Sequence, residues 1–103
     1  MVVRTWHGWT SKENADRYEQ LLRSEVAHEI ESKVPAGFQG IELCRKEEED
    51  EVAFMTIMRF DSIESIKALT GEEVERAYVP AAAQAVLKRY DTTVTHYEVT
   101  FSR

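Results

Sequence analysis

Val52-Ala53-Phe54-Met55-Thr56-Ile57-Met58-Arg59-Phe60 is the stretch that decides the fold of this chain. Its composition predicts a β-strand that is apolar on both faces, with one set formed by Val52, Phe54, Met58 and Phe60 and the other by Ala53, Met55 and Ile57. A strand that joins its neighbour through a short hairpin and has no polar face must be covered twice. The predicted helices suffice for one side, so we expect a second copy of the chain to cover the other.

Length and charge narrow the class of protein. The 103 residues are expected to form a single domain, residues 1–103, with one core. The 13 basic and 19 acidic residues give a net charge of −6, and the basic ones are scattered, which argues against nucleic acid or an anionic membrane as a partner. No stretch is long and apolar enough to span a bilayer, and Cys44 is the single cysteine. We therefore expect a cytoplasmic protein without an internal disulfide.

The first half of the chain predicts a strand, a helix and a second strand. Residues 2–9 mix β-branched and aromatic side chains, as strands do. Thr10 and Glu13 have the spacing of a capping box, which predicts that a helix begins here. One apolar stripe at offsets of three and four then continues to Val34, before Pro35-Ala36-Gly37 ends the helix. Residues 38–46 form the second predicted strand, and the acidic run 47–51 is expected to be a solvated hairpin tip.

The second half predicts a broken helical region and a last strand. Asp61-Ser62-Ile63-Glu64 repeats the capping pattern before a short helix that ends at Gly71. Residues 72–79 are expected to form a second helical piece or a lid, residues 81–90 a third helix after Pro80, and residues 91–101 the last strand. The resulting order, βαββαβ, predicts an α+β, ferredoxin-like sandwich with a four-stranded antiparallel sheet and helices on one face.

Four short motifs resemble the antibiotic-biosynthesis-monooxygenase family, and together they are spread over almost the whole chain. They are Arg4-Thr5-Trp6-His7-Gly8, Phe60-Asp61-Ser62-Ile63-Glu64-Ser65-Ile66, Tyr78-Val79-Pro80 and His96-Tyr97-Glu98-Val99. The resemblance implies a homodimeric α+β barrel in which two sheets meet face to face. It also implies oxidation of a polycyclic aromatic substrate, or heme degradation, in a cleft between sheet and helices, often without a flavin or metal prosthetic group.

The resemblance to the heme-degrading branch is incomplete. That branch uses an Asn on the first strand and a Trp and an axial His in the second helical region, where this chain has Thr5, Leu69 and the pair Tyr78-Val79. Since none of these supplies an imidazole, heme degradation is disfavoured. We expect no cofactor, and the three histidines do not have the spacing of a metal site.

His7 and Tyr78 are the candidate catalytic residues. We place His7, with Thr5, on the face toward the helices, where its imidazole could remove a phenolic proton from a substrate. Tyr78 precedes Pro80 at a helix junction, and its phenol could orient a substrate oxygen. The simpler alternatives are a hydrogen-bonded sheet histidine and an aromatic anchor of the lid. Four further residues are expected to line the substrate site: Thr5, Trp9, Phe54 and Tyr97.

The opposite face of the sheet is expected to form the dimer interior. We place Arg4, Arg59 and His96 there, with His96 paired to Glu98 or to one of the arginines, and Trp6 as an interface anchor.

Two classes of function remain open. The first is a cofactor-independent monooxygenase acting on an aromatic or polyketide-like small molecule. The second is a non-catalytic dimeric barrel that binds a hydrophobic small molecule or serves as an accessory protein. A pocket above Thr5, His7 and Phe54 with a titratable group inside would favour the first class, and a cleft filled by Tyr18, Leu22 and Tyr97 the second.

Overall fold

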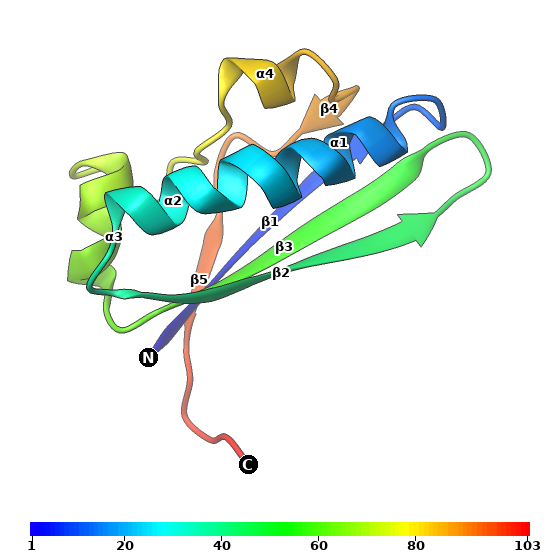
Figure 1. The fold of residues 1–103 in the computed structure, drawn as a ribbon. Coiled ribbons are helices and arrows are strands. Elements are labelled where there is room, and N and C mark those ends of the chain that lie inside the picture. Colours follow the sequence, from blue (N-terminus) through cyan, green and yellow to red (C-terminus); the bar gives the residue numbers. More distant parts are fainter.

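The computed structural model describes residues 1–103. They form one antiparallel sheet with helices on one side (Figure 1). Its elements are β1 (Val2–Thr10), α1 (Ala15–Leu21), α2 (Ala27–Lys33), β2 (Phe38–Glu47), β3 (Val52–Phe60), α3 (Ile63–Thr70), α4 (Ala81–Gln84), β4 (Arg89–Tyr90) and β5 (Thr95–Glu98). The strands lie in the order β2-β3-β1, and both β4 and β5 pair with β1. The predicted α+β, ferredoxin-like fold is confirmed.

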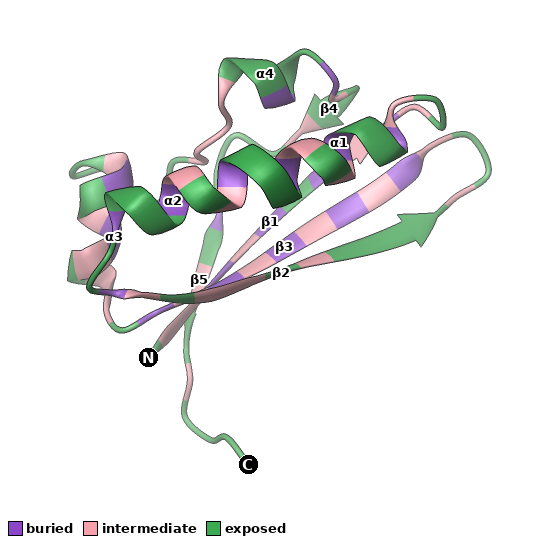
Figure 2. Ribbon diagram, in the orientation of Figure 1, coloured by how far each residue is buried: buried purple, intermediate pink, exposed green.

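The predicted central strand is confirmed with its bounds. β3 pairs along its whole length with β1 and with β2, and its side chains alternate between buried and half-buried (Figure 2). Val52, Phe54, Met58 and Phe60 face the helices and are at most 6% exposed. Ala53, Met55 and Ile57 lie on the other face, which no element of the chain covers. We call this uncovered side of the sheet the open face.

The faces of β1 are the reverse of our expectation. Arg4 and Trp6 are buried on the side of the helices, whereas Thr5 and His7 lie on the open face. The register explains this, because Trp6 pairs with Thr56, and directly paired residues of an antiparallel sheet point to the same side. Gly8 belongs to the helix side because a Cβ at this position would overlap the Trp6 ring.

The long helix follows the predicted apolar stripe with one irregularity. A π-helical turn, Leu22–Val26, joins α1 to α2, and the buried residues Tyr18, Leu22, Val26, Ile30 and Val34 recur every four positions. In a regular α-helix four residues advance by about 400°, so this stripe would drift by about 40° at each step. A wider π turn advances less per residue and returns the stripe to the sheet.

Helix starts and ends agree with the sequence in part. A cap at the start of α3 is present, one residue later than the Asp61–Glu64 pattern places it: the Ser62 side chain accepts a hydrogen bond from the Ser65 N–H. Gly71 ends the helix at φ 75°, as predicted. The predicted capping box at Thr10 is wrong. The helix begins at Ala15, because residues 11–14 form a turn in which the Asn14 N–H donates to Ser11. The Thr10 hydroxyl is buried without a partner.

The C-terminal third contains less regular structure than predicted. Residues 72–79 form no helix, and the helix predicted over 81–90 ends at Gln84, because the chain turns so that the Lys88 N–H can donate to the Trp9 carbonyl. The last strand is interrupted: β4 lies opposite Gly8 and Trp9, β5 lies opposite residues 2–5, and residues 91–94 bulge between them. Two backbone hydrogen bonds join this bulge to residues 72–79. The Ala77 N–H donates to the Thr92 carbonyl, and the Val94 N–H donates to the Glu75 carbonyl.

Candidate functional site

A small apolar cavity lies between the sheet and the helices. Eleven of its fourteen lining residues are hydrophobic, and its volume is about 20 Å³. Tyr18 and Leu22 of the long helix form part of its roof, and Trp6, Thr56 and Met58 part of its floor. About 20 Å³ is room for roughly one water molecule, so the cavity in this conformation is nearly filled by its own side chains.

Arg4 brings a positive charge into this apolar cavity. Its side chain has no exposed surface, and Nη1 donates to the Val74 carbonyl at 2.7 Å while Nη2 donates to the Arg76 carbonyl at 2.8 Å. Burial lowers the pKa of Arg4 to about 10, so the guanidinium is still protonated at neutral pH. No carboxylate lies within ion-pair distance of it. The charge is therefore held by neutral groups alone, the two backbone carbonyls and the His96 imidazole.

Two polar atoms in the lining have no partner. Arg4 Nε and Thr56 Oγ1 are both buried and make no hydrogen bond within the chain. Arg4 pairs with Met58 across the β1–β3 ladder and Thr56 pairs with Trp6, so the two residues are diagonal neighbours on one face. Buried donors and acceptors are nearly always satisfied in native proteins, so this corner of the cavity lacks a polar group that a ligand or water would supply.

Tyr78 forms one wall of the cavity. Its hydroxyl donates to the Glu29 carboxylate of α2, and Lys33 Nζ lies 4.7 Å from the centre of its ring. Partial burial and the Glu29 carboxylate raise the pKa of the Tyr78 phenol, which therefore remains a hydrogen-bond donor at neutral pH. This arrangement suits an anchor that holds residues 74–80 against α2. We call residues 72–80 the strap.

An open groove lies on the outer side of the same wall. It has a volume of about 620 Å³ and shares Tyr78, Val79 and Pro80 with the inner cavity. Leu69 of α3 and Tyr90 of β4 line its far side. Displacement of the three shared residues would join cavity and groove into a space within the range of about 300–1,000 Å³ that small-molecule sites occupy.

The structure divides the sequence-predicted site residues between the two faces of the sheet. Of these residues, Tyr78 lines the cavity, and Phe54 packs beneath the Tyr18 ring with ring centres 4.9 Å apart. Thr5, Trp9 and Tyr97 lie on the open face with His7, and the Thr5 hydroxyl donates to the Thr95 carbonyl there. The single pocket expected above Thr5, His7 and Phe54 is thus wrong, because Phe54 and His7 project from opposite sides.

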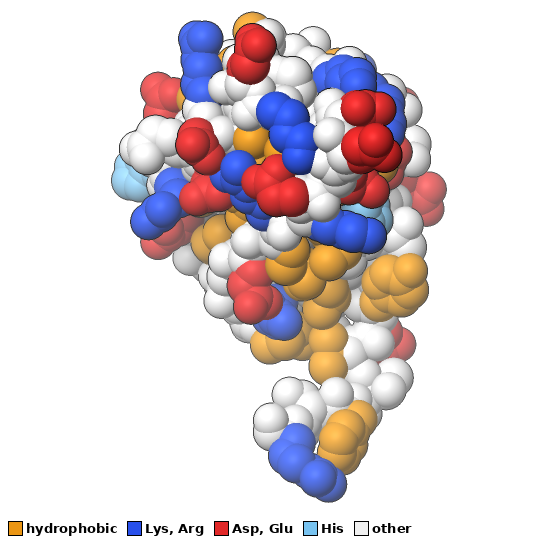
Figure 3. Space-filling view, turned by 90° about the vertical axis from the view of Figure 1, so that its right-hand side faces the viewer, with side chains coloured by type: hydrophobic (Ala, Val, Ile, Leu, Met, Phe, Trp, Pro, Cys, Tyr) orange, Lys and Arg blue, Asp and Glu red, His pale blue; other side chains and the backbone are white.

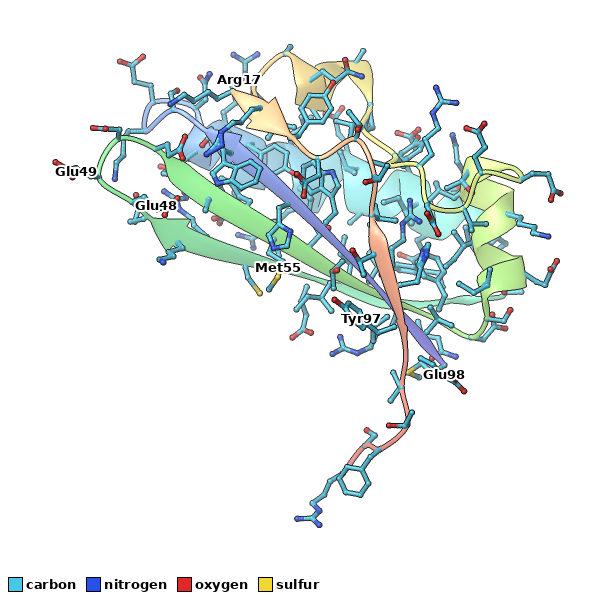
Figure 4. The ribbon with its side chains drawn as sticks, turned by 180° about the vertical axis from the view of Figure 1, so that it is seen from behind. Arg17, Glu48, Glu49, Met55, Tyr97 and Glu98 are labelled. Carbon is cyan, nitrogen blue, oxygen red and sulfur yellow. The ribbon has the colours of Figure 1, made fainter.

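His7 and its surroundings are exposed. The His7 imidazole stacks on Trp9 and lies 3.6 Å from the Asp91 carboxylate, with nearly half of its side chain in contact with solvent. Figure 4 shows Met55 and Tyr97 on the same open side, and Tyr97 is 59% exposed. Within one copy of the chain nothing encloses these side chains. A site at His7 would need a second copy.

The expectations for the dimer face are also corrected. Trp6 is not on it, because its indole N–H donates to the Asp91 carbonyl beneath the helices. His96 does lie beside Arg4, as one of our alternatives proposed, but both are on the helix side, with 2.9 Å between Arg4 Nη1 and His96 Nε2. Of the residues placed there, Arg59 lies on the open face and pairs with Glu42.

Sequence reasoning missed Arg4 and Thr56 as site residues. The sequence carried part of this signal. Arg4 lies two residues before Trp6, and Thr56 two residues after Phe54, so each shares a strand face with a strongly apolar side chain. A polar residue within a buried face of a strand is a candidate for function. The carbonyl groups that make the burial of Arg4 possible come from the strap, about seventy positions away, and leave no local pattern.

These features define a ferredoxin-like α+β protein with an internal apolar pocket beneath a strap. Comparison with protein-family models gives no match, and comparison with curated proteins gives none either. Solved structures do match over nearly the whole chain. A Bacillus cereus protein assigned as an antibiotic biosynthesis monooxygenase shares the fold at a TM-score of 0.66 and 14% identity, over 99% of this chain and 95% of that one.

A heme degrader from Mycobacterium tuberculosis, MhuD, matches as well. The structure of MhuD with two bound hemes gives a TM-score of 0.57 at 20% identity, over 100% of this chain and 99% of that one. An MhuD variant with two manganese protoporphyrin IX molecules per active site gives 0.59 at 19%, over 100% and 98%. The family resemblance seen in the sequence is therefore confirmed at the level of the fold.

The residues present do not fit a heme. None of the three histidines lines the cavity or the groove: His7 is on the open face, His28 is exposed on α2, and His96 lies behind Arg4. No group of three or more His, Cys, Asp or Glu side chains is arranged to hold a metal ion.

Proposed function

We propose that this protein is a monooxygenase-like enzyme that oxidises an aromatic or polyketide-like small molecule, without a cofactor, in the space between sheet and helices. The observation that carries this proposal is the apolar cavity that shares Tyr78, Val79 and Pro80 with an adjoining groove of about 620 Å³. The fold shared with the Bacillus cereus protein supports it. In this proposal the strap opens to admit the substrate.

The reaction that fits such a cavity is oxidation of an activated methylene group. Loss of a proton gives a carbanion that reacts with dioxygen; overall the CH₂ group becomes a carbonyl, one oxygen atom is retained, and the other leaves as water with both hydrogens. The apolar walls exclude water from the carbanion, and Arg4 stabilises its charge. His7, on the open face, has no part in this scheme.

Oxygen uptake with anthrone tests the proposal. Anthrone carries an activated methylene between two aromatic rings, and we expect its conversion to anthraquinone with uptake of one dioxygen per molecule. Ala83→Leu should abolish the activity, because Ala83 is 3% exposed and lines the cavity, so the larger side chain fills it. Ala82→Leu is the matched control on the exposed side of α4 and should be active. Equal rates with and without the protein would refute the proposal.

A second function, non-catalytic binding of a hydrophobic small molecule, is favoured by one observation. The cavity lined by Tyr18 and Leu22 measures about 20 Å³, so two of the three residues expected to fill the cleft of a binding module contribute; the third, Tyr97, lies on the open face. This function predicts that aromatic compounds bind with the same sensitivity to Ala83→Leu but without oxygen uptake.

The open face supports a homodimer as part of the same proposal. Apolar side chains gather on the lower half of the molecule in Figure 3, away from the charged groups around the helices. Val3, Trp9, Ala53, Met55 and Ile57 are only half-buried on this face of a single copy. A second copy packed sheet to sheet would cover them, as the doubly apolar β3 requires.

The compartment is a further part of the proposal. No helix of the structure is of a length and hydrophobicity that would cross a bilayer. Cys44 is an exposed free thiol on the same side of β2 as Glu42. An exposed thiol is compatible with the reducing cytoplasm, which we propose as the location.

A further inference from the structure

We infer that the cavity binds a ligand that carries one acidic oxygen of the phenol or enol type, taken up as its anion, with that oxygen accepting hydrogen bonds from Arg4 Nε and Thr56 Oγ1. This inference rests on the proposed small-molecule pocket and names its substrate class. Both atoms are buried, both residues line the cavity, and both lack a partner in the chain.

The charge of the ligand follows from the uncompensated charge of Arg4. A buried cation is normally paired with an anion, because removal of its hydration shell is costly. Arg4 is fully buried, and its hydrogen-bond partners are two carbonyl groups and Nε2 of the His96 imidazole, none of which carries a negative charge. Hydrogen bonds to neutral groups offset the loss of water in part, and an anion in the cavity would supply the missing charge.

The form of the acid follows from the hydrogen bonds that Arg4 already makes. Nη1 and Nη2 both donate to carbonyls of the strap, so Nε is the one guanidinium nitrogen without a partner. A carboxylate prefers two parallel hydrogen bonds from a guanidinium, whereas a phenolate or enolate offers a single oxygen. One free nitrogen and one free hydroxyl therefore suit a single-oxygen acid better than a carboxylate.

The rest of the lining agrees with an aromatic body on this acid, which the cavity can hold once Tyr78, Val79 and Pro80 are displaced toward the groove. Trp6, Tyr18 and Met58 contribute flat or polarisable apolar surface around the polar corner. Burial raises the pKa of Tyr18, so its phenol stays neutral and does not compete as an anion for Arg4. The carbanion of the proposed reaction is an anion of this kind, and Arg4 and Thr56 would stabilise it before it reacts with dioxygen.

Binding of 4-nitrophenol tests this inference, with nitrobenzene and 4-nitrobenzoate as matched probes. Calorimetry at a pH where both acids ionise should show 4-nitrophenol binding at least about tenfold more tightly than either. The absorbance of bound 4-nitrophenol should report the phenolate at a pH where the free compound is largely protonated. Quenching of Trp6 in a Trp9→Phe background locates the probe, because Trp9 is the other tryptophan and lies on the open face.

Two threonines give a matched pair of variants. Thr56→Val removes the hydroxyl from the cavity without touching the contacts of Arg4 with the strap, and it should weaken 4-nitrophenol binding about tenfold while leaving nitrobenzene unchanged. Thr10→Val removes another buried unpartnered hydroxyl, from outside the cavity, and should change neither. A parallel Arg4→Met variant should abolish the preference for the phenol.

Other results of these binding measurements would each refute a different part of the inference. Equal affinity for 4-nitrophenol and nitrobenzene, or no effect of Thr56→Val, refutes the acidic-oxygen site and leaves the apolar pocket intact. Tighter binding of 4-nitrobenzoate refutes the single-oxygen assignment. Absence of Trp6 quenching by every probe refutes the small-molecule pocket, and the inference with it.

Discussion

Arg4 Nη1 lies 2.9 Å from His96 Nε2, so the imidazole must accept this hydrogen bond and carry its proton on Nδ1. Burial, and then the positive charge of Arg4, lower the pKa of His96 below its ordinary value. Protonation of His96 would place two cations in contact beneath the helices. The contact between Arg4 and His96 is therefore a site at which acidification destabilises the fold.

Stability should fall on mild acidification because of His96. Its folded-state pKa lies below the unfolded value of 6.5, so the unfolded chain binds more protons in this range. Stability is thus full above pH 6.5 and is lost as the pH falls toward the lower folded-state pKa. Urea midpoints measured from pH 7.5 to 5 should decrease, and His96→Asn should flatten this dependence. His28→Asn, on the exposed side of α2, is the control, and a flat wild-type curve would contradict the expectation.

Arg4→Met should destabilise the fold by about 1–3 kcal/mol, because the Val74 and Arg76 carbonyls lose their donors. Hydrogen exchange of the Ala77 and Val94 amides, which join the strap to the bulge, should accelerate most. Urea denaturation and exchange mass spectrometry measure the two effects. Arg59→Met on the open face should affect neither amide; unchanged exchange in Arg4→Met would show that Arg4 does not hold the strap.

Tyr78→Phe should loosen the wall between cavity and groove. The phenol loses its hydrogen bond to Glu29, at a cost of about 1 kcal/mol in stability, while the ring still packs. Association and dissociation of 4-nitrophenol should both become faster in stopped-flow measurements, with the dissociation constant changed little. Ser24→Ala removes a hydroxyl from the exposed side of the long helix that carries Glu29, and it should leave both rates unchanged. Slower association in Tyr78→Phe would count against a gate at this wall.

Ile57→Arg should yield a monomer. Ile57 lies on the open face of the central strand, where a second copy would bury the new charge. Light scattering at micromolar concentration should give a dimer for the wild type and for Glu31→Lys, on the exposed side of α2, and about half that mass for Ile57→Arg. A monomeric wild type would remove the dimer from the proposal.

Local patterns predicted much of the fold. Alternation predicted the bounds of β3, and helix breakers predicted the end of the long helix before Pro35. Capping chemistry predicted the start of α3 to within one residue. The faces of β1 could not be assigned by the same logic, because Arg4 and Gly8 make the buried face look polar. Arg4 is buried through carbonyl groups of the distant strap, and Gly8 through the size of the Trp6 ring.

The candidate site was predicted less well than the fold, for the same reason. Tyr78 was selected because it precedes Pro80 at a predicted helix junction, and it does line the cavity. His7 was selected for its chemistry, but one residue of register decides whether a strand side chain faces the helices or the open side. The C-terminal helix was predicted too long because tertiary pairing of residues 88–90 with β1 outweighs alanine propensity.

Asp91 touches both sides of the sheet. Its carbonyl accepts from the Trp6 indole beneath the helices, its amide donates to the His7 carbonyl, and its carboxylate faces the His7 imidazole on the opposite surface. A bound molecule that shifts the indole would therefore pull on the peptide group whose side chain lies on the open face, which the proposed dimer would bury. In the proposed dimer, this aspartate would link occupancy of the cavity to the pairing of the two subunits through only a few bonds.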